Sequence, residues 1–339
     1  MQFLRRSTFR IIYLYTGLAS LIGDMEGSLT YAATTSGNKF YNIAKDLAAI
    51  NAKNEEVTTR DGHLYGYIVE VNAFASANGL LSFATIPNTW KVRNAFRKFH
   101  FARDLMFDQA GVEESERGKY GHTMRPYFSA EHRQDGDRPL RIVDIPNTGD
   151  AVQREVTGGE WTYSKLASQP TLSEGQLAKD LDLALVDKWD IHVLGPSVVS
   201  DGDGGAFTWD SVGMVTSYNV DRMSQIPDAD NTAYPASTIT PDNNPLAALR
   251  TQNLGTGEVL DLAKDQEEEK PPYDILNSGD SVDAVVQHMA YMSSSGEAAT
   301  RRLGTMFVPA GLLMVQSTAT GSNGLNLKVI GKVLCKDMA

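Results

Sequence analysis

The stretch TMFVPAGLLMVQST (305–318), followed by LNLKVIGKVLCK (325–336), indicates the fold class of the chain. Both runs are rich in Val, Leu and other apolar residues, and the residues between them, Gly321 to Gly324, have the composition of a turn. We therefore expect two long strands at this end of the chain, which supply much of a hydrophobic core. The sequence predicts a mainly β protein.

Further strands are expected upstream. Residues 63–75 (HLYGYIVEVNAFA) alternate in part and are rich in β-branched and aromatic residues. Residues 80–86 are predicted as their hairpin partner, because Asn78-Gly79 is a turn dipeptide that tolerates positive φ. Other strand candidates are 124–128, 140–145, 161–166, 183–194 and 212–220. Many strands at irregular spacing, joined by long loops, predict a jelly-roll β-sandwich, in the form of a single roll with long loop insertions.

One prominent helix is predicted over residues 90–110. Asn88 or Thr89 can cap its start, and Gly111 can terminate it. A shorter helix is expected over 41–56, where apolar residues recur at helical spacing.

The long helix carries the concentrated basic residues of the chain. They are Lys91, Arg93, Arg97, Lys98 and Arg103. One interpretation is an amphipathic helix that packs over a sheet and leaves its cations in solvent. The other is a contact to a nucleic-acid backbone, because Arg and Lys neutralise phosphates and neighbouring aromatic rings can stack on bases.

The overall charge restricts how a nucleic acid could be bound. The chain of 339 residues has a formal net charge of −11. This charge disfavours nonspecific binding of nucleic acid by the whole surface. There is no long basic arm, since the N-terminal cluster consists of Arg5, Arg6 and Arg10. Any contact with a nucleic acid must therefore be local, or its charge must be neutralised from elsewhere.

The sequence contains none of the common catalytic or cofactor motifs. No G-x-G-x-x-G, Walker A, G-x-S-x-G, H-E-x-x-H or C-x-x-C pattern is present. Asp201 and Asp203 lie in a DGDGG stretch that is an ordinary turn or, alternatively, a weak structural Ca²⁺ site. We expect no enzyme activity, no cofactor and no small-molecule substrate. A hydrolase whose carboxylate pair is assembled only by folding is a third, minor alternative.

The domain organisation is expected to be an N-terminal extension, 1–24, and one jelly-roll domain, 25–339. Long loops are predicted at 113–160 and 225–282. The apolar residues 11–22 follow a basic cluster, which allows three interpretations: an extended upstream start, a segment that packs or inserts, or a secretory signal.

Several stretches together resemble the capsid proteins of small circular single-stranded DNA viruses from aquatic environments. They are YAATTSGNKFYNIAKDLAAINAKNEEVTTRDGHLYGY (31–67), PNTWKVRNAFRKFHFARDLMFDQAGV (87–112), GKYGHTMRPYF (118–128), GGEWTYSKLA (158–167), KWDIHVLG (188–195) and MFVPAGLLMVQS (306–317). The resemblance implies a jelly-roll protein that assembles in many copies into an icosahedral shell. It also implies packaged single-stranded DNA, a location in the virion and contact with a host surface receptor.

The alternative is a secreted or phage-derived β-sandwich binding protein. Such a protein would recognise a glycan or a cell surface through the loop 225–258, which is rich in Pro, Asn and Asp. Large closed particles would oppose this alternative, whereas cleavage after about residue 24 in a secreting host would favour it.

Overall fold

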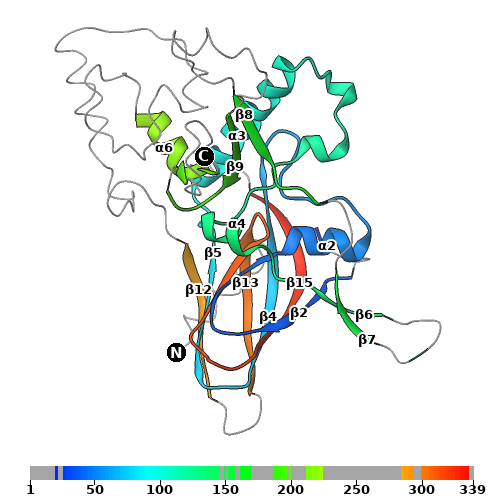
Figure 1. Ribbon diagram of the computed structural model, residues 1–339, viewed down its shortest axis with the longest axis vertical. Helices are drawn as coiled ribbons and strands as arrows, with labels where there is room; N and C mark the ends of the chain where they lie inside the picture. Colours follow the sequence, from blue (N-terminus) through cyan, green and yellow to red (C-terminus); the bar gives the residue numbers. More distant parts are fainter. Residues whose placement is uncertain are drawn as a thin grey trace, which may run out of the picture.

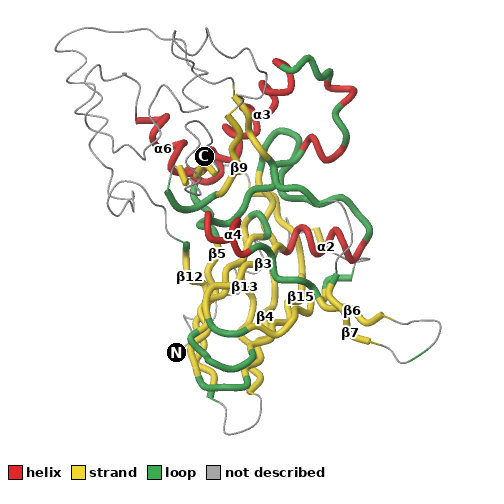
Figure 2. Tube along the Cα trace, viewed as in Figure 1, coloured by secondary structure: helices red, strands yellow, loops and turns green. Residues whose placement is uncertain are grey.

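The structure, a computed structural model, is mainly β. It describes residues 20–21, 26–144, 149, 152–156, 161–168, 187–196, 198–199, 211–223, 284–293 and 299–335. In Figures 1 and 2 the long strands fill the lower half of the molecule, and most of the helices lie in the upper half.

The first sheet is built around the C-terminal strand β15 (Asn323–Cys335). This strand lies between β2 (Ser28–Thr34) and β4 (Leu64–Ala75), and β4 pairs on its other side with β13 (Ala299–Pro309). The short strand β1 (Ser20–Leu21) also pairs with β15. All of these pairs are antiparallel.

The second sheet has four strands. Their order is β12 (Val285–Met292), β5 (Gly79–Thr85), β14 (Leu312–Ser317) and β3 (Gly37–Asn42), and all of the pairs are antiparallel. Strand β12 pairs only with β5 among the described strands, so it forms an edge of this sheet.

The eight long strands pair in a nested order. Strand β2 pairs with β15, β3 with β14, β4 with β13, and β5 with β12. The chain therefore forms one long antiparallel ribbon that is folded over on itself. The tip of this ribbon, between β5 and β12, holds the insertion 86–284.

The core lies between the two sheets. Val69 and Val71 of the first sheet, and Phe83 and Leu313 of the second, are fully buried members of one apolar cluster. Alternate residues of a strand point to opposite faces, so each strand contributes its inward set to this cluster. Burial of these side chains is the main stabilising contribution to the sandwich.

Two expected strand connections are wrong. The predicted hairpin at Asn78-Gly79 is not formed, because β4 and β5 belong to different sheets and the turn connects them across the sandwich. Residues 305–318 also divide into two strands, β13 and β14, in different sheets. The chain turns between them at Ala310 (φ 57°) and Gly311 (φ 71°).

The helices and the smaller sheets belong mostly to the insertion. They are α3 (Trp90–Gln109), the 3-10 helices Glu114–Glu116 and Lys119–His122, α4 (Ala130–Asp135), β6 (Arg141–Asp144), β7 (Val152–Glu155), β8 (Lys165–Ser168), β9 (Asp187–His192), β10 (Val198–Val199), β11 (Ser211–Gly213) and α6 (Met214–Met223). Helix α2 (Ile43–Asn51) lies between β3 and β4. Strands β6 and β7 pair as a hairpin that projects from the body of the molecule (Figure 1).

The prediction of the long helix is confirmed, with Thr89 as its cap. Residues 212–220 were expected to be a strand, but the strand ends at Gly213 and α6 follows, packed against α3. The predicted strand 124–128 is replaced by an extended segment with one isolated bridge. The expected loop 113–160 contains α4, which Ser129 caps. Tertiary packing outweighs the local preference at these places.

Two expectations for the chain organisation lie largely outside the described residues. These are the loop 225–282 and most of the extension 1–24. Within the extension, Ser20–Leu21 pair with β15, so part of it adds to the first sheet. In the described part of the chain, no helix combines the length and the apolar character needed to cross a bilayer.

Candidate functional site

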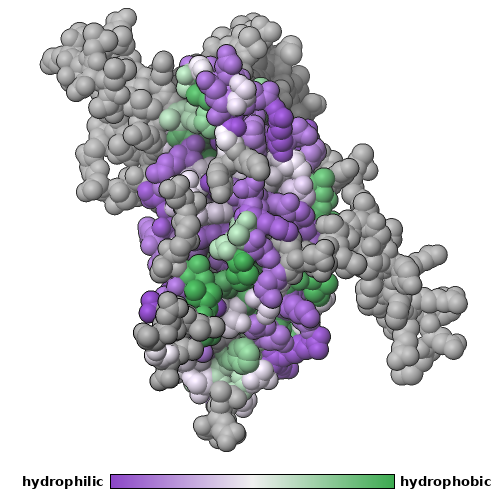
Figure 3. All heavy atoms as spheres, turned by 90° about the vertical axis from the view of Figure 1, so that its right-hand side faces the viewer, coloured by the Kyte–Doolittle hydropathy of each residue, from purple (hydrophilic) through white to green (hydrophobic). Residues whose placement is uncertain are grey.

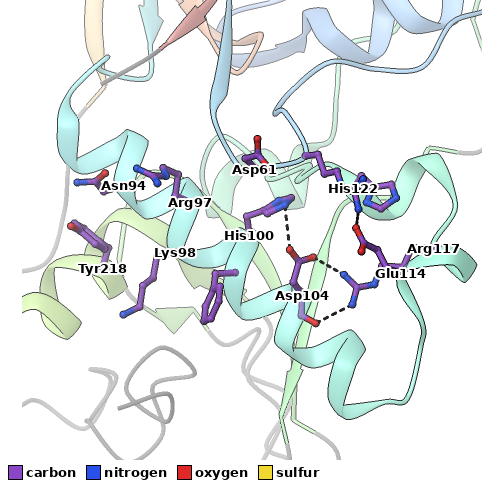
Figure 4. Close-up of a pocket in the computed structure, with 12 residues that line it drawn as sticks. Asp61, Asn94, Arg97, Lys98, His100, Asp104, Glu114, Arg117, His122 and Tyr218 are labelled. Carbon is purple, nitrogen blue, oxygen red and sulfur yellow. Dashed lines mark hydrogen bonds and ion pairs between the residues drawn. The ribbon is translucent and has the colours of Figure 1, made fainter. Parts of the chain in front are cut away.

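A surface cleft of about 510 Å³ lies beside α3 (Figure 4). Its walls come from α3, from α6, from the turn at 60–61 and from the 3-10 segments between 114 and 122. Four cationic side chains, three carboxylates, two histidines and two aromatic rings line it. A cleft of this size can hold a small ligand or a unit of a polymer.

The structure divides the five predicted basic residues into two groups. Arg97 and Lys98 line the cleft. Lys91 and Arg103 are buried, with 8% and 3% of their surface exposed, and Arg93 donates to the carbonyl and side-chain oxygens of Asn88. The expected single basic face is therefore not formed, because α3 is covered by both α6 and β8.

The exposed part of α3 in the cleft combines an aromatic ring with two cations. Phe101 is 61% exposed, and Arg97 is exposed one turn before it. Lys98 pairs with Asp221 of α6 at 2.8 Å, which ties the two helices together. Residues at spacings of three and four share a helix face, so Arg97 and Lys98 both flank Phe101.

A chain of polar contacts along α3 joins the helix to the segment that follows it. His100 Nε2 lies 3.5 Å from Asp104, and Arg117 contacts Asp104 at 3.2 Å and Asp108 at 2.5 Å (Figure 4). The guanidinium of Arg103 faces His100 Nδ1 at 3.4 Å, so this nitrogen can only accept. Burial and the nearby Arg103 charge lower the pKa of His100, which stays neutral at pH 7.

The rim of the cleft holds an exposed ion pair between Arg60 and Glu114. Both side chains are 62% exposed, and exposed pairs of this kind contribute little stability and exchange partners readily. Taken together, the cleft has four cations against three carboxylates, in a chain whose net charge is −11. Two of these cations, Lys98 and Arg117, also pair with Asp221 and Asp108 beside the cleft, so the cations of the cleft are largely matched by carboxylates.

Arg103 has a structural role behind the cleft. It donates to the backbone oxygen of Thr123, and burial lowers its pKa to about 10, so it remains charged at neutral pH. Thr123 donates in turn to Glu55 at 2.9 Å, and Glu55 pairs with Arg125 at 2.8 Å. No pattern in the sequence marks this buried network, because its members are far apart along the chain.

A second His-containing pair has the residue types of a nucleophile and its base. His192 Nδ1 lies 2.5 Å from Ser211 Oγ, and His192 Nε2 lies 2.9 Å from the Pro196 oxygen. Both side chains are fully buried, and burial lowers the pKa of His192 to about 4. With no solvent access and both ring nitrogens engaged, the pair stabilises the joint between β9 and β11.

The two predicted Ca²⁺ ligands, Asp201 and Asp203, lie outside the described residues. Among the residues that the structure does describe, no group of three or more His, Cys, Asp or Glu is placed to hold a metal ion.

The chain matches no protein-family model, no curated protein and no solved structure. The function of the chain is therefore inferred from its strand order, its exposed surfaces and the cleft beside α3.

Proposed function

We propose that the sandwich is a single jelly roll and that the chain is a capsid protein, which assembles into an icosahedral shell around a small genome. The observation that carries this proposal is the nested strand order, in which β2 to β5 pair in reverse order with β12 to β15. A jelly roll has eight antiparallel strands in two sheets, and viral capsid domains use this architecture.

The position of the insertion supports a shell-forming role. Residues 86–284 leave the roll at one place, the tip between β5 and β12, so all eight strands keep their pairing. A shell protein needs a rigid β core together with peripheral elements that can meet neighbouring copies. The insertion and the projecting β6–β7 hairpin supply such elements (Figure 1).

The edge strand β12 offers an apolar surface for contacts between copies. Val285, Val286, Met289 and Tyr291 are 44–61% exposed. On another face, Figure 3 shows hydrophobic atoms in separate patches among hydrophilic ones in the lower half, where the sandwich lies. An exposed apolar edge invites association, and contacts between copies bury such surface.

The partners in this proposal are other copies of the chain and the packaged nucleic acid, with single-stranded DNA as the genome that the resemblance implies. A host surface receptor is a further expected partner, and the virion is the expected location. The function is structural, without a catalytic residue or a cofactor. The Ca²⁺ alternative at Asp201 and Asp203 stays a prediction.

Expression of the full chain, followed by size-exclusion chromatography with light scattering and negative-stain electron microscopy, tests the proposal. We expect uniform round particles that contain nuclease-resistant nucleic acid. A monomer at every salt and Ca²⁺ concentration would contradict the shell. It would favour the β-sandwich binding protein, whose recognition loop at 225–258 lies outside the described residues.

A further inference from the structure

We propose that the α3 cleft binds unpaired nucleotides of a single-stranded nucleic acid, with a base stacked on Phe101 and the neighbouring phosphates contacted by Arg97 and Lys98. The choice of a nucleic acid rests on the proposed function. The placement of the contacts rests on the geometry of the cleft alone.

Phe101 is the feature that points to bases. With 61% of its surface exposed, the Phe101 ring lies outside the apolar core, whereas Phe96 and Phe99 of the same helix are fully buried in it. Aromatic rings on single-strand-binding proteins stack on successive bases, and this contact is tolerant of sequence because every base has a flat face. Tyr218 of α6 lines the same cleft and offers a second ring.

The two cations are placed where phosphates would lie. Arg97 and Lys98 precede Phe101 by four and three residues, so they flank the ring on one helix face. Successive phosphates along a strand are separated by one nucleotide, which allows one base to stack while the phosphates on either side meet these cations. The pair between Lys98 and Asp221 leaves the Lys98 side chain 31% exposed, within reach of solvent and of a phosphate.

Two of the three carboxylates that line the cleft are paired with cations, and the third is Asp61. Glu114 is paired with Arg60, and Asp104 with Arg117, so their charges are balanced within the cleft. His100 is neutral at pH 7, and its Nε2 lies 3.5 Å from Asp104. On the Phe101 side, Arg97 is exposed and Lys98 is 31% exposed, so both can reach a phosphate although the protein as a whole is acidic.

Stacking on Phe101 selects unpaired strands. In a duplex, the faces of each base are covered by the neighbouring base pairs, so a ring on a helix surface can reach only the backbone. We therefore expect the cleft to bind a single strand in preference to a duplex of the same sequence.

The test uses the full chain from the unassembled fraction of a size-exclusion column and a fluorescent oligothymidylate of about 12 nucleotides, within the usual range of single-strand site sizes. Binding is followed by fluorescence anisotropy. Phe101→Leu is expected to weaken binding about tenfold, and Phe101→Trp is expected to restore it. Arg97→Ala is expected to weaken binding and to lower the salt slope of log K by about 0.7, the change for one phosphate contact.

Matched controls lie on the sandwich. Phe74→Leu changes another exposed ring, on β4, and Lys328→Ala removes one positive charge at an exposed position of β15. Both controls are expected to bind like the unaltered chain. Circular dichroism of each variant shows whether the fold is kept.

Equal affinity of the unaltered chain and Phe101→Leu, or equal affinity for the single strand and the duplex, would overturn the inference. A weakening by Lys328→Ala as large as that by Arg97→Ala would also overturn it, because the binding would then follow net charge. Particle formation is scored separately in the same preparations. If particles form but binding does not depend on Phe101 and Arg97, only this inference is refuted. If binding depends on these residues but the chain never assembles, only the shell proposal is refuted.

Discussion

Asp137 connects three separate parts of the chain. Its carboxylate accepts hydrogen bonds from Lys45 Nζ at 2.6 Å, from His132 Nε2 at 2.7 Å and from Tyr163 OH at 2.7 Å. His132 Nδ1 accepts from the backbone N–H of Phe128 at 2.9 Å, so His132 is held as the neutral Nε2–H tautomer. Lys45 belongs to α2, His132 to α4 and Tyr163 to the segment before β8. This one carboxylate therefore connects α2, which lies between two strands of the sandwich, to two parts of the insertion.

Removal of this carboxylate is expected to be costly. Asp137→Ala removes the acceptor of the buried His132 N–H and of two partly exposed donors, Lys45 and Tyr163, and we expect a loss of about 3 kcal/mol in the free energy of unfolding, measured by urea denaturation. Asp135→Ala, at an exposed position of α4, is the control and is expected to change it by less than about 0.5 kcal/mol. A loss for Asp137→Ala no larger than that for the control would contradict the proposed junction.

The pH dependence of this contribution follows from the pKa of Asp137. Burial acts to raise this pKa, but the hydrogen bonds from His132 and Lys45, together with the Lys45 charge, outweigh burial and hold it at about 2. A carboxyl with a lowered folded-state pKa contributes stability above its unfolded value near 3.8. This contribution is lost as the pH falls from there toward 2.

Asp46 shows the opposite behaviour. Burial raises its pKa to about 7, while Tyr31 OH donates to it at 2.6 Å. The folded protein therefore binds a proton at this residue between about pH 4 and pH 7, and the contribution of Asp46 to stability falls as the pH rises through this window.

Replacement of Asp46 by Asn should remove the loss of stability that occurs as the pH rises from about 4 to about 7. An amide oxygen still accepts from Tyr31, so we expect Asp46→Asn to be more stable than the unaltered chain by on the order of 2 kcal/mol at about pH 8. The difference should shrink toward about pH 4. Denaturation midpoints across this pH range provide the measurement, and a difference that does not change with pH would count against a proton at Asp46.

At the scale of elements, the corner between β13 and β14 decides how the chain changes sheets. Gly311 has φ of +71°, and a Cβ at this position would lie 2.8 Å from the backbone nitrogen of Ala44. The Gly311 carbonyl also accepts from the N–H of Ile43 at 2.8 Å. The corner is therefore packed directly against the start of α2.

A matched pair of substitutions separates backbone strain from this close contact. Gly304 has φ of +97° with nothing within 4 Å of its Cβ position, so Gly304→Ala tests the effect of positive φ alone. We expect Gly311→Ala to be less stable than Gly304→Ala by about 1–3 kcal/mol in thermal or urea unfolding. Equal effects would show that the contact with α2 relaxes without cost.

At the scale of the whole molecule, assembly should depend on the outer surface of β12. Met289 is 61% exposed on this edge strand, and a charge placed there would be buried if copies meet at this surface. We expect Met289→Glu to abolish particles while the chain remains folded, and Thr320→Glu, at an exposed loop position, to leave them intact. Light scattering and electron microscopy measure particle formation by both variants. Normal particles from Met289→Glu would show that the contacts between copies do not involve the outer surface of β12.

The sequence alone determined the character of several elements. The apolar content of residues 325–336 marks β15, and the partial alternation of residues 63–75, rich in β-branched and aromatic residues, marks β4. The cap at Thr89 and the long apolar face mark α3 in the same way. The sequence also shows the basic residues of α3, but it does not show which of them reach solvent.

Only the tertiary structure decided which strands pair and which cations are exposed. Alternation shows which face of a strand is buried, but it does not say whether the next strand lies beside it or across the core, so the Asn78-Gly79 turn was assigned to a hairpin that is not formed. Likewise, the burial of Lys91 and Arg103 depends on elements from distant parts of the chain that cover α3. The cleft at Phe101 exists because α6 and the 3-10 segments meet the helix there, and long-range packing of this kind leaves no local pattern in the sequence.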